Sequence, residues 1–311
     1  MTTCRVRAFA PGSIGNVGPG FDILGLAVAG WGDTVTATRA DRAGVAVTDP
    51  GLPDLPTDPE RHTSGIAASE VLRLANAGRC GVSLAVEKGL PLSGGAGGSA
   101  ASAVASAVAV NALFGLGLDA DRLLEACLAA EERVAGRHAD NLAPALLGGL
   151  VLVRSVDPLD VVRLPVPADL RIVLAHPAQR LTTAEARAVL PSMVPRALAM
   201  RQAAHVAALV AALAAADWAL LARAVDDFIA EPARAPLLPG FVDAKRAALD
   251  AGALGASISG AGPTAFAFVR SVEDGDRVAR AMRDAYGRAG VDCRVRVADV
   301  DRVGARVVEW G

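Results

Sequence analysis

Residues 91–101 form the segment of this sequence best suited to chemistry. They are Pro-Leu-Ser-Gly-Gly-Ala-Gly-Gly-Ser-Ala-Ala, and the small residues that follow predict a helix as far as Asn111. Glycine lets successive backbone N–H groups turn toward a ligand with no side chain in the way, and a helix that begins there adds the positive end of its dipole. The segment is therefore predicted to bind the phosphate groups of a ligand.

Two familiar kinds of phosphate site match this segment poorly. A Walker P-loop ends in Gly-Lys-Ser/Thr, where the lysine brings charge to the outer phosphates, but the residue before Ser99 is a glycine. Gly95, Gly97 and Ala100 have the spacing of a dinucleotide fingerprint. That fingerprint also needs an acidic residue at the end of the next strand, about 20 residues later, whereas Asp119 stands at a predicted helix start. By itself, the segment leaves a dinucleotide site open.

Three motifs together resemble those of one family of small-molecule kinases. The glycine segment is similar to the ATP loop of the family named after galactokinase, homoserine kinase, mevalonate kinase and phosphomevalonate kinase (GHMP). Residues 10–22, Ala-Pro-Gly-Ser-Ile-Gly-Asn-Val-Gly-Pro-Gly-Phe-Asp, resemble its first motif, and residues 255–264, Gly-Ala-Ser-Ile-Ser-Gly-Ala-Gly-Pro-Thr, resemble its third. Residues 16–22, 138–144 (His-Ala-Asp-Asn-Leu-Ala-Pro) and 231–237 are similar to the homoserine kinase branch.

This resemblance implies a fold and an activity. The fold is the two-domain GHMP kinase fold, of the α+β class. An ATP-binding domain similar to a ribosomal-protein domain is expected over residues 1–165, and a ferredoxin-like α/β-plait domain over residues 166–311. The implied activity is ATP-dependent, Mg²⁺-assisted phosphorylation of the L-homoserine hydroxyl to O-phospho-L-homoserine, a step in threonine biosynthesis. Kinases of this kind are often homodimers.

The resemblance also assigns residues to ATP and Mg²⁺. Ser99 and Glu131 are the implied Mg²⁺ ligands; Ser99 also suits a helix N-cap, and the neighbouring Glu132 leaves the choice of glutamate open. Lys88 stands where the family often has a lysine, and both phosphate contact and simple solvation stay open for it. The predicted ATP-binding residues are Lys88, Pro91, Leu92, Ser93, Gly94, Gly95, Ala96, Gly97, Gly98, Ser99, Ala100 and Ala101.

A homoserine pocket needs groups for an ammonium, a carboxylate and a hydroxyl. By the resemblance, Asp22 pairs with the ammonium group, while Arg187 and Arg234 bind the carboxylate with forked donors. Thr183 and Arg187 are four residues apart at a predicted helix start, hence on one face. The predicted homoserine-binding residues are Asn16, Asp22, His138, Asn141, Thr183, Arg187 and Arg234.

The implied catalytic residues are Asn141, Arg234 and Asp140. Related sugar and mevalonate kinases place an aspartate near the reacting hydroxyl, and this branch has Asn141 in that place. Because asparagine cannot accept a proton, the hypothesis is direct attack by the hydroxyl, with its proton lost to the γ-phosphate or to solvent. Asp140 is the alternative base.

The glycine segment departs from the family at two positions. The usual Gly-Leu-Gly-Ser-Ser is Gly-Ala-Gly-Gly-Ser here, so Ala96 removes apolar packing and Gly98 removes a hydroxyl donor. Two alternatives stay open: a family member that phosphorylates another small alcohol, and a sensor that binds its ligand without turnover. Retention of Arg187 and Arg234 counts against the first, because an alcohol without a carboxylate needs neither.

Strands and helices in mixed order must position these residues, which favours an α+β fold. Alternating or continuous apolar residues predict strands at 5–10, 23–28, 33–38, 82–86, 150–153, 170–174, 256–258, 265–269 and 293–297. Apolar residues at helical spacing predict helices at 64–77, 121–134, 183–190, 196–214, 217–229, 240–251 and 272–289. A loop is expected over the Gly/Pro-rich residues 11–21.

Composition narrows the partners and the compartment. The net charge of this 311-residue chain is −2 and its basic residues are scattered, so no nucleic acid partner is expected. Apolar stretches such as residues 100–114 are shorter than the ~20 residues of a membrane span, and no secretory leader is visible. The four cysteines are far apart in the sequence. We therefore expect a cytoplasmic protein with free thiols.

Overall fold

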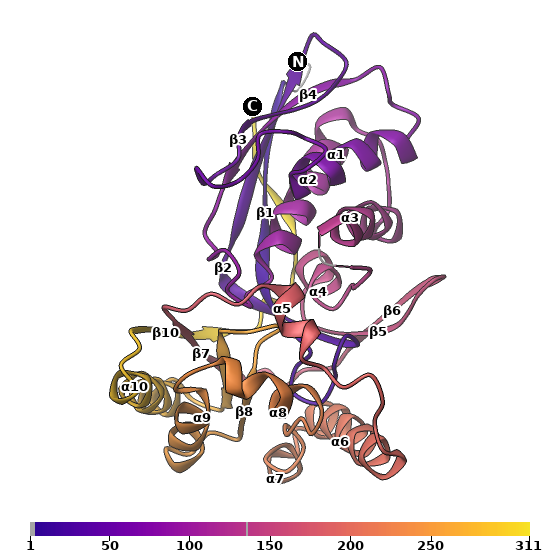
Figure 1. The fold of residues 1–311 in the computed structure, drawn as a ribbon. Helices are drawn as coiled ribbons and strands as arrows, with labels where there is room; N and C mark the ends of the chain where they lie inside the picture. Colours follow the sequence, from indigo (N-terminus) through magenta and orange to yellow (C-terminus); the bar gives the residue numbers. More distant parts are fainter. Residues whose placement is uncertain (1–3, 135) are drawn as a thin grey trace.

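The chain forms two sheets with helices packed against each, one above the other in Figure 1. The computed structural model describes residues 4–134 and 136–311, and within them the sheets have seven and four strands. The strands are β1 (Arg5–Gly15), β2 (Leu24–Ala40), β3 (Gly44–Asp49), β4 (Gly81–Glu87), β5 (Leu150–Val156), β6 (Leu159–Leu164), β7 (Arg171–Pro177), β8 (Gly255–Ile258), β9 (Ala265–Val269), β10 (Cys293–Asp299) and β11 (Arg306–Trp310). The helices are α1 (Thr63–Leu74), α2 (Gly98–Phe114), α3 (Ala120–Val134), α4 (Leu142–Leu147), α5 (Thr183–Ala188), α6 (Arg196–Ala215), α7 (Trp218–Leu221), α8 (Ala230–Arg234), the 3₁₀ turn η1 (Ala235–Leu237), α9 (Phe241–Asp250) and α10 (Val272–Arg288).

The larger sheet carries the helix that follows the glycine segment. Its order is β11-β1-β2-β4-β3, with β5 paired to β2 and β6, and α1 to α4 lie on one side of it (Figure 1). Helix α2 packs on β1 and β2, and all of residues 100–107 are buried, so every side of its first turns is covered. Alanine, serine and valine allow this close approach. A helix covered on all sides needs no polar face, which explains its composition.

Strand β11 brings the end of the described chain back to the larger sheet. It runs antiparallel to β1, with Val6 opposite Trp310 and Phe9 opposite Arg306. A strand from the predicted second domain therefore completes the sheet of the predicted first domain. A division of the remaining chain at residue 165 stays a prediction.

The smaller sheet is antiparallel throughout, in the order β10-β7-β9-β8. Alternate residues of β7 face opposite sides: Val173 packs in one core with Phe241 of α9, and Leu174 packs in another with Leu209 of α6. The second of these cores also contains Ile14 of β1. The two sheets therefore share one apolar core, and the cavity described below lies against the elements that meet there.

Several predicted elements are wrong in extent. The strands expected at 23–28 and 33–38 form one strand, β2. The loop expected from residue 11 begins later, because after a bulge the residues up to Gly15 pair with β2. The helix expected over 217–229 is only the four-residue α7. The chain then turns at Asp227, whose buried carboxylate accepts the backbone N–H groups of Ile229 and Glu231 and so begins α8.

Helix α6 is, within the described ranges, the one helix long and apolar enough to cross a bilayer. It has 20 residues, and Arg201, Gln202 and His205 interrupt its apolar sequence. Its buried Gln202 donates hydrogen bonds to the main-chain oxygen of Pro19 (2.9 Å) and to Asp227 (2.8 Å). A single such helix is weak evidence for a membrane segment, and these bonds anchor it to the protein.

Candidate active site

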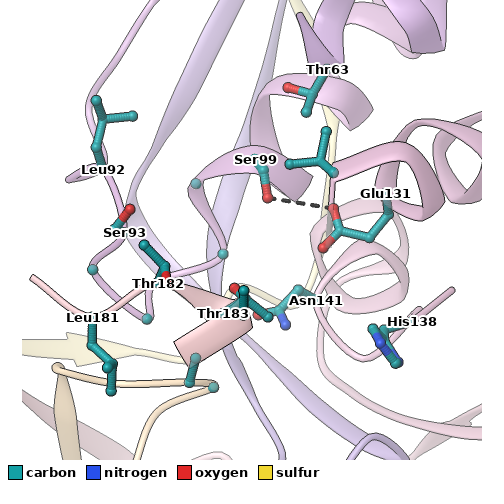
Figure 2. Close-up of a pocket in the computed structure, with 18 of the residues that line it drawn as sticks. Thr63, Leu92, Ser93, Ser99, Glu131, His138, Asn141, Leu181, Thr182 and Thr183 are labelled. Atoms are coloured by element: carbon teal, nitrogen blue, oxygen red, sulfur yellow. Dashed lines mark hydrogen bonds between the residues drawn. The ribbon is translucent and has the colours of Figure 1, made fainter. Parts of the chain in front are cut away.

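A cavity of about 470 Å³ brings most of the predicted site residues together. Figure 2 shows Leu92 and Ser93 on one side of it and Ser99 and Glu131 on the other. Ala96, Ala100 and Ala101 do not line it, because they are buried in the core. The predicted residues that do line it are Asn16, Asp22, Lys88, Pro91, Leu92, Ser93, Gly94, Gly95, Gly97, Gly98, Ser99, Glu131, His138, Asp140, Asn141, Thr183, Arg187 and Arg234.

Residues 91–97, called the phosphate loop below, lead into α2 with a backbone that only glycine suits. Gly95 and Gly97 have φ angles of 70° and 68°. A Cβ atom on Gly95 would lie 2.5 Å from the main-chain oxygen of Ser259, and one on Gly97 would lie 2.2 Å from Ser13 Oγ. Helix α2 begins at Gly98 without a side-chain cap. Its first N–H groups are therefore left for an anion, as the sequence predicts.

The phosphate loop is held from the second half of the chain by the third motif. Ser259 Oγ donates to the main-chain oxygen of Gly95 at 2.6 Å. The Thr264 N–H donates to the main-chain oxygen of Gly94 at 3.2 Å, and the Thr264 hydroxyl donates to the same oxygen. Ser259 and Thr264 do not line the cavity. Their hydrogen bonds to the loop carbonyl groups therefore hold the loop from outside it.

Lys88 lies under the phosphate loop in a buried ion pair with Asp33. Its side chain is 4% exposed, which excludes simple solvation. Its ammonium group also donates to the main-chain oxygen of Gly98 and to Ser102 Oγ, both at 2.9 Å. All three of its N–H bonds therefore have protein acceptors, so a phosphate contact of Lys88 stays a prediction without support from its hydrogen bonding.

Ser99 and Glu131 form the candidate metal site. Ser99 Oγ donates to Glu131 Oε2 at 3.4 Å (Figure 2). Burial, together with the charge of Asp140, raises the pKa of Glu131 to about 7. Glu132 is half-exposed and pairs with Arg137 at 2.9 Å, so Glu131 is the glutamate that faces the cavity. A hydroxyl and a carboxylate oxygen beside the phosphate loop are ligands that Mg²⁺ prefers, so these residues fit that cation.

Asp22 and Arg187 pair with each other at the opposite end of the cavity. Two guanidinium nitrogens of Arg187 donate to the two carboxylate oxygens of Asp22, at 2.7 and 3.1 Å. His138 Nδ1 lies 3.6 Å from the same carboxylate, and burial lowers the pKa of this imidazole. The anion and one of the cations predicted for homoserine are thus adjacent and oriented by a bidentate contact.

Arg234 is a buried cation without a carboxylate partner among the described residues. It is 3% exposed, and it donates to the main-chain oxygens of Ala186 at 3.1 Å and Gly260 at 2.9 Å. The Phe21 ring lies close to both arginines, with its centroid 5.2 Å from the Arg234 guanidinium and 5.5 Å from that of Arg187. A buried charge that lacks a counter-ion is costly, so this end of the cavity favours an anion.

Comparisons with known proteins agree with this arrangement. The profile of the GHMP kinases N terminal domain matches residues 64–149, and that of the GHMP kinases C terminal domain matches residues 209–288. A homoserine kinase of Arabidopsis thaliana is 44% identical over 97% of this chain and 84% of its own length. A homoserine kinase of Chlorobium phaeobacteroides is 43% identical over 90% of this chain and 92% of its own length. The chain belongs to the GHMP kinase family. A homoserine kinase structure from Cytophaga hutchinsonii is 41% identical, with a TM-score of 0.95 over 99% of this GHMP kinase and 98% of that chain.

The predicted reacting end of this GHMP kinase contains Asp140 and Asn141, side by side before α4. Asp140 accepts the backbone N–H of Asn16 at 3.1 Å, and burial, with the charge of Asp22, raises its pKa to about 7. Asn141 Oδ1 accepts the Ser13 hydroxyl at 2.9 Å, and its Nδ2 donates to none of the described residues. Its amide N–H groups are therefore available to a ligand.

Some residues of the GHMP kinase cavity were not found from the sequence. They include Leu55, Pro56, Arg61 and His62 before α1, Thr63 at its first position, Ser102 of α2, Val134 of α3, Leu181 and Thr182 before α5, and Ala184 of α5. Asp33 was also missed. It shares one face of β2 with the buried Val35 and Ala37, and a carboxylate at an inward position of a strand is a signal that the sequence does contain.

Proposed function

We propose that this chain is a homoserine kinase, which transfers the γ-phosphoryl group of ATP to the side-chain hydroxyl of L-homoserine in threonine biosynthesis. The products are ADP and O-phospho-L-homoserine. The identity to homoserine kinases over nearly the full chain supports the activity. The structural observation that carries it is Arg234, a buried cation with no carboxylate partner in residues 4–134 and 136–311, in the same cavity as the phosphate loop.

The charged end of the cavity suits a zwitterionic amino acid. The Asp22 carboxylate matches the ammonium group of homoserine, and the guanidinium groups of Arg187 and Arg234 match its carboxylate. Because Asp22 and Arg187 already face each other, a zwitterion can take one contact from each without leaving either charge unpaired. We propose that His138, Thr183 and the remaining polar residues orient the rest of the molecule.

The phosphate end suits ATP with Mg²⁺. The N–H groups at the start of α2 and in the phosphate loop would hold the phosphates, and Ser99 and Glu131 would hold the cation. When bound, Mg²⁺ would neutralise charge that develops on the phosphate oxygens. Burial keeps the Glu131 carboxyl partly protonated near neutral pH, so its proton must leave before it can serve as a ligand.

For the transfer step, we propose direct attack of the homoserine hydroxyl oxygen on the γ-phosphorus of ATP. The bond between that phosphorus and the bridging oxygen breaks, ADP leaves, and the hydroxyl proton passes to the transferred phosphoryl group or to solvent. Phosphoryl transfer passes through a loose transition state, so positioning and charge stabilisation matter more than early removal of the proton. The available amide N–H groups of Asn141 can orient the reacting groups, and Arg234 fixes the substrate carboxylate. Asp140, with a pKa of about 7, is the alternative proton acceptor.

A substrate panel tests the proposed function. Purified protein, ATP and Mg²⁺ are mixed with homoserine, mevalonate, galactose or threonine, and ADP release is followed with a coupled assay. We expect release with homoserine and background rates with mevalonate and galactose. Fastest release with another alcohol would identify a different kinase of the family. Calorimetric binding of homoserine without ADP release from any alcohol would identify a sensor.

We further propose that the enzyme is a cytoplasmic homodimer, as the family resemblance implies. Sedimentation velocity of the purified protein would measure the assembly directly, and a species of about 31.5 kDa, the mass of one chain, would contradict the dimer.

A further inference from the structure

Asp33 is a fully buried carboxylate that contacts the chain on both sides of the phosphate loop. It lies on β2 and is 0% exposed. Its Oδ1 accepts the backbone N–H groups of Gly89 at 3.0 Å and Leu90 at 3.1 Å, directly before the loop. Its Oδ2 accepts Ser102 Oγ at 2.6 Å, in the first turns of α2 directly after the loop. The hydrogen-bonding capacity of the carboxylate is thus used entirely by the segments on either side of the loop.

Lys88 completes the connection to the start of α2, which follows the loop. Its ammonium group pairs with Asp33 Oδ2 and donates to the main-chain oxygen of Gly98, the first residue of α2, and to Ser102 Oγ. The residues just before the phosphate loop and those at the start of α2 therefore both contact one buried ion pair. A loop whose two ends are both fixed has fewer conformations to lose when it binds a ligand.

This chain has a particular need for such a connection. Two glycines, Gly97 and Gly98, stand at the start of α2, where no side chain caps the helix. Glycine is the most flexible residue and a poor helix former, so the first N–H groups of α2 are not held in place by local sequence preference. The contact of Lys88 with the Gly98 carbonyl supplies that restraint.

We propose that Asp33 and Lys88 are positioning residues that hold the two ends of the phosphate loop in the geometry that binds ATP, and that Lys88 does so without contacting the phosphates. The proposal rests on the proposed function. A move of the ammonium group to a phosphate would leave Asp33 as a buried, unpaired carboxylate, which is strongly unfavourable.

Four variants separate positioning from direct phosphate contact: Asp33→Asn, Lys88→Met, the double variant, and Lys245→Met. Lys245 is the only other lysine in the chain. It forms a partly buried ion pair with Glu231 at 2.6 Å, outside the phosphate loop, and is the matched control. Calorimetry measures the ATP dissociation constant, and steady-state kinetics measures KM for ATP and for homoserine.

Positioning predicts that either single substitution raises the ATP dissociation constant by roughly tenfold or more, because one buried partner is left unpaired. KM for ATP should rise with it, while KM for homoserine changes by less than about twofold, the size of effect expected for uncoupled sites. The double variant should bind ATP no more weakly than the worse single variant. Lys245→Met should bind ATP as the unmodified protein does.

Direct phosphate contact predicts a different pattern, in which Lys88→Met loses affinity while Asp33→Asn, which frees the ammonium group, binds ATP equally well or more tightly. That result would overturn the proposal. If either single variant does not fold, Ser102→Ala removes one hydroxyl from the same network, and unchanged ATP affinity in that variant would also overturn it. ATP binding is measured without homoserine. Weaker ATP binding in both single variants than in the unmodified protein therefore supports the proposal even if homoserine is not the substrate.

Discussion

The two ends of the cavity are built in different ways. At the phosphate end, the backbone of Gly94, Gly95, Gly97 and Gly98 lines the cavity, and buried side chains such as Asp33 and Thr264, which do not line it, fix that backbone. At the charged end, the side chains of Asp22, Arg187 and Arg234 themselves face the cavity. We infer that the first end recognises what all nucleoside triphosphates share and the second distinguishes one alcohol from another.

This difference has a consequence for mutation. A backbone site is sensitive to any side chain that changes the path of the chain, and it tolerates changes in side-chain chemistry that leave the path unaltered. A side-chain site is sensitive to chemistry even when shape is kept. The predictions below test this distinction.

The largest effect is expected at Arg234, where a lysine keeps the charge but loses the forked geometry. Two of its donors hold the main-chain oxygens of Ala186 and Gly260. We expect Arg234→Lys to lower kcat/KM for homoserine by roughly 100- to 1000-fold, the range for disrupting a buried charged contact, with ATP affinity unchanged. The control is Arg201→Lys, whose guanidinium also stacks on a phenyl ring, that of Phe228. Equal losses in both variants would contradict the assignment.

Next in size is a methyl group added to the phosphate loop. Gly95→Ala places a Cβ atom 2.5 Å from the main-chain oxygen of Ser259, at a φ of 70°. We expect ATP affinity to fall by roughly 100-fold, which corresponds to about 2.7 kcal/mol of strain and lost contacts. In Gly98→Ala the nearest atom is 3.3 Å away and the φ angle is ordinary, so its ATP dissociation constant should change far less. Calorimetry of both variants provides the comparison.

At the reacting end, the direct-attack hypothesis predicts unequal effects for two adjacent residues. Asn141→Ala removes the available amide N–H groups and should lower kcat by roughly 10- to 100-fold, as loss of a positioning hydrogen bond does. Asp140→Asn keeps the shape and the acceptor for the Asn16 N–H, and should leave kcat within about threefold, since no general base of 10²-fold or greater effect is lost. A drop of several decades in Asp140→Asn with normal folding would make Asp140 the base.

Asp140 should also make folding stability depend on pH. Its folded-state pKa of about 7 lies above the ordinary value of 3.8, so its contribution is fully present below about pH 4 and is lost as pH rises through 7. Asparagine does not ionise. The melting temperature of Asp140→Asn minus that of the unmodified protein should therefore rise between pH 4 and pH 8. If this difference stays constant, the Asp140 carboxyl either remains protonated over this range or is exposed.

The smallest effect is expected from Gly98→Ser, which adds the hydroxyl that the family resemblance leads one to expect at this position. The added Cβ atom would lie 3.3 Å from the main-chain oxygen of Pro91 and 3.4 Å from Lys88 Nζ, a close but tolerable fit. Serine is favoured over glycine in a helix by about 0.5 kcal/mol. We expect a slightly higher melting temperature and an ATP dissociation constant about two- to threefold lower. Weaker binding would indicate that the tight fit outweighs the gain.

The sequence predicted the residues that line the cavity better than it predicted their partners. The phosphate loop is local, and glycine spacing alone identifies it. The bidentate contact of Asp22 with Arg187 joins residues 165 positions apart, and nothing in either motif indicates it. For Lys88, phosphate contact and simple solvation were both open, and neither is a buried ion pair. Its partner Asp33 lies on β2, and only the sheet register brings the two residues together.

The choice between Glu131 and Glu132 shows the same limit. Adjacent residues on a helix point about 100° apart, so which one faces the cavity depends on how α3 is rotated against α1 and α2. The predicted helix at 217–229 was wrong for a related reason. Apolar spacing does not reveal that the Asp227 carboxylate accepts the N–H groups at the start of α8. Residue 230, where a capping box would have a glutamate, is an alanine.

The return of β11 to the larger sheet ties the two ends of the chain together. Val6 and Trp310 are paired across almost the whole sequence, and contacts of such separation form late and slowly in folding. Until β11 arrives, the edge of β1 presents unpaired N–H and C=O groups to any other strand. A fragment that ends at residue 165 would keep that edge permanently open, and we expect it to self-associate, so the ATP-binding half is best studied within the intact chain.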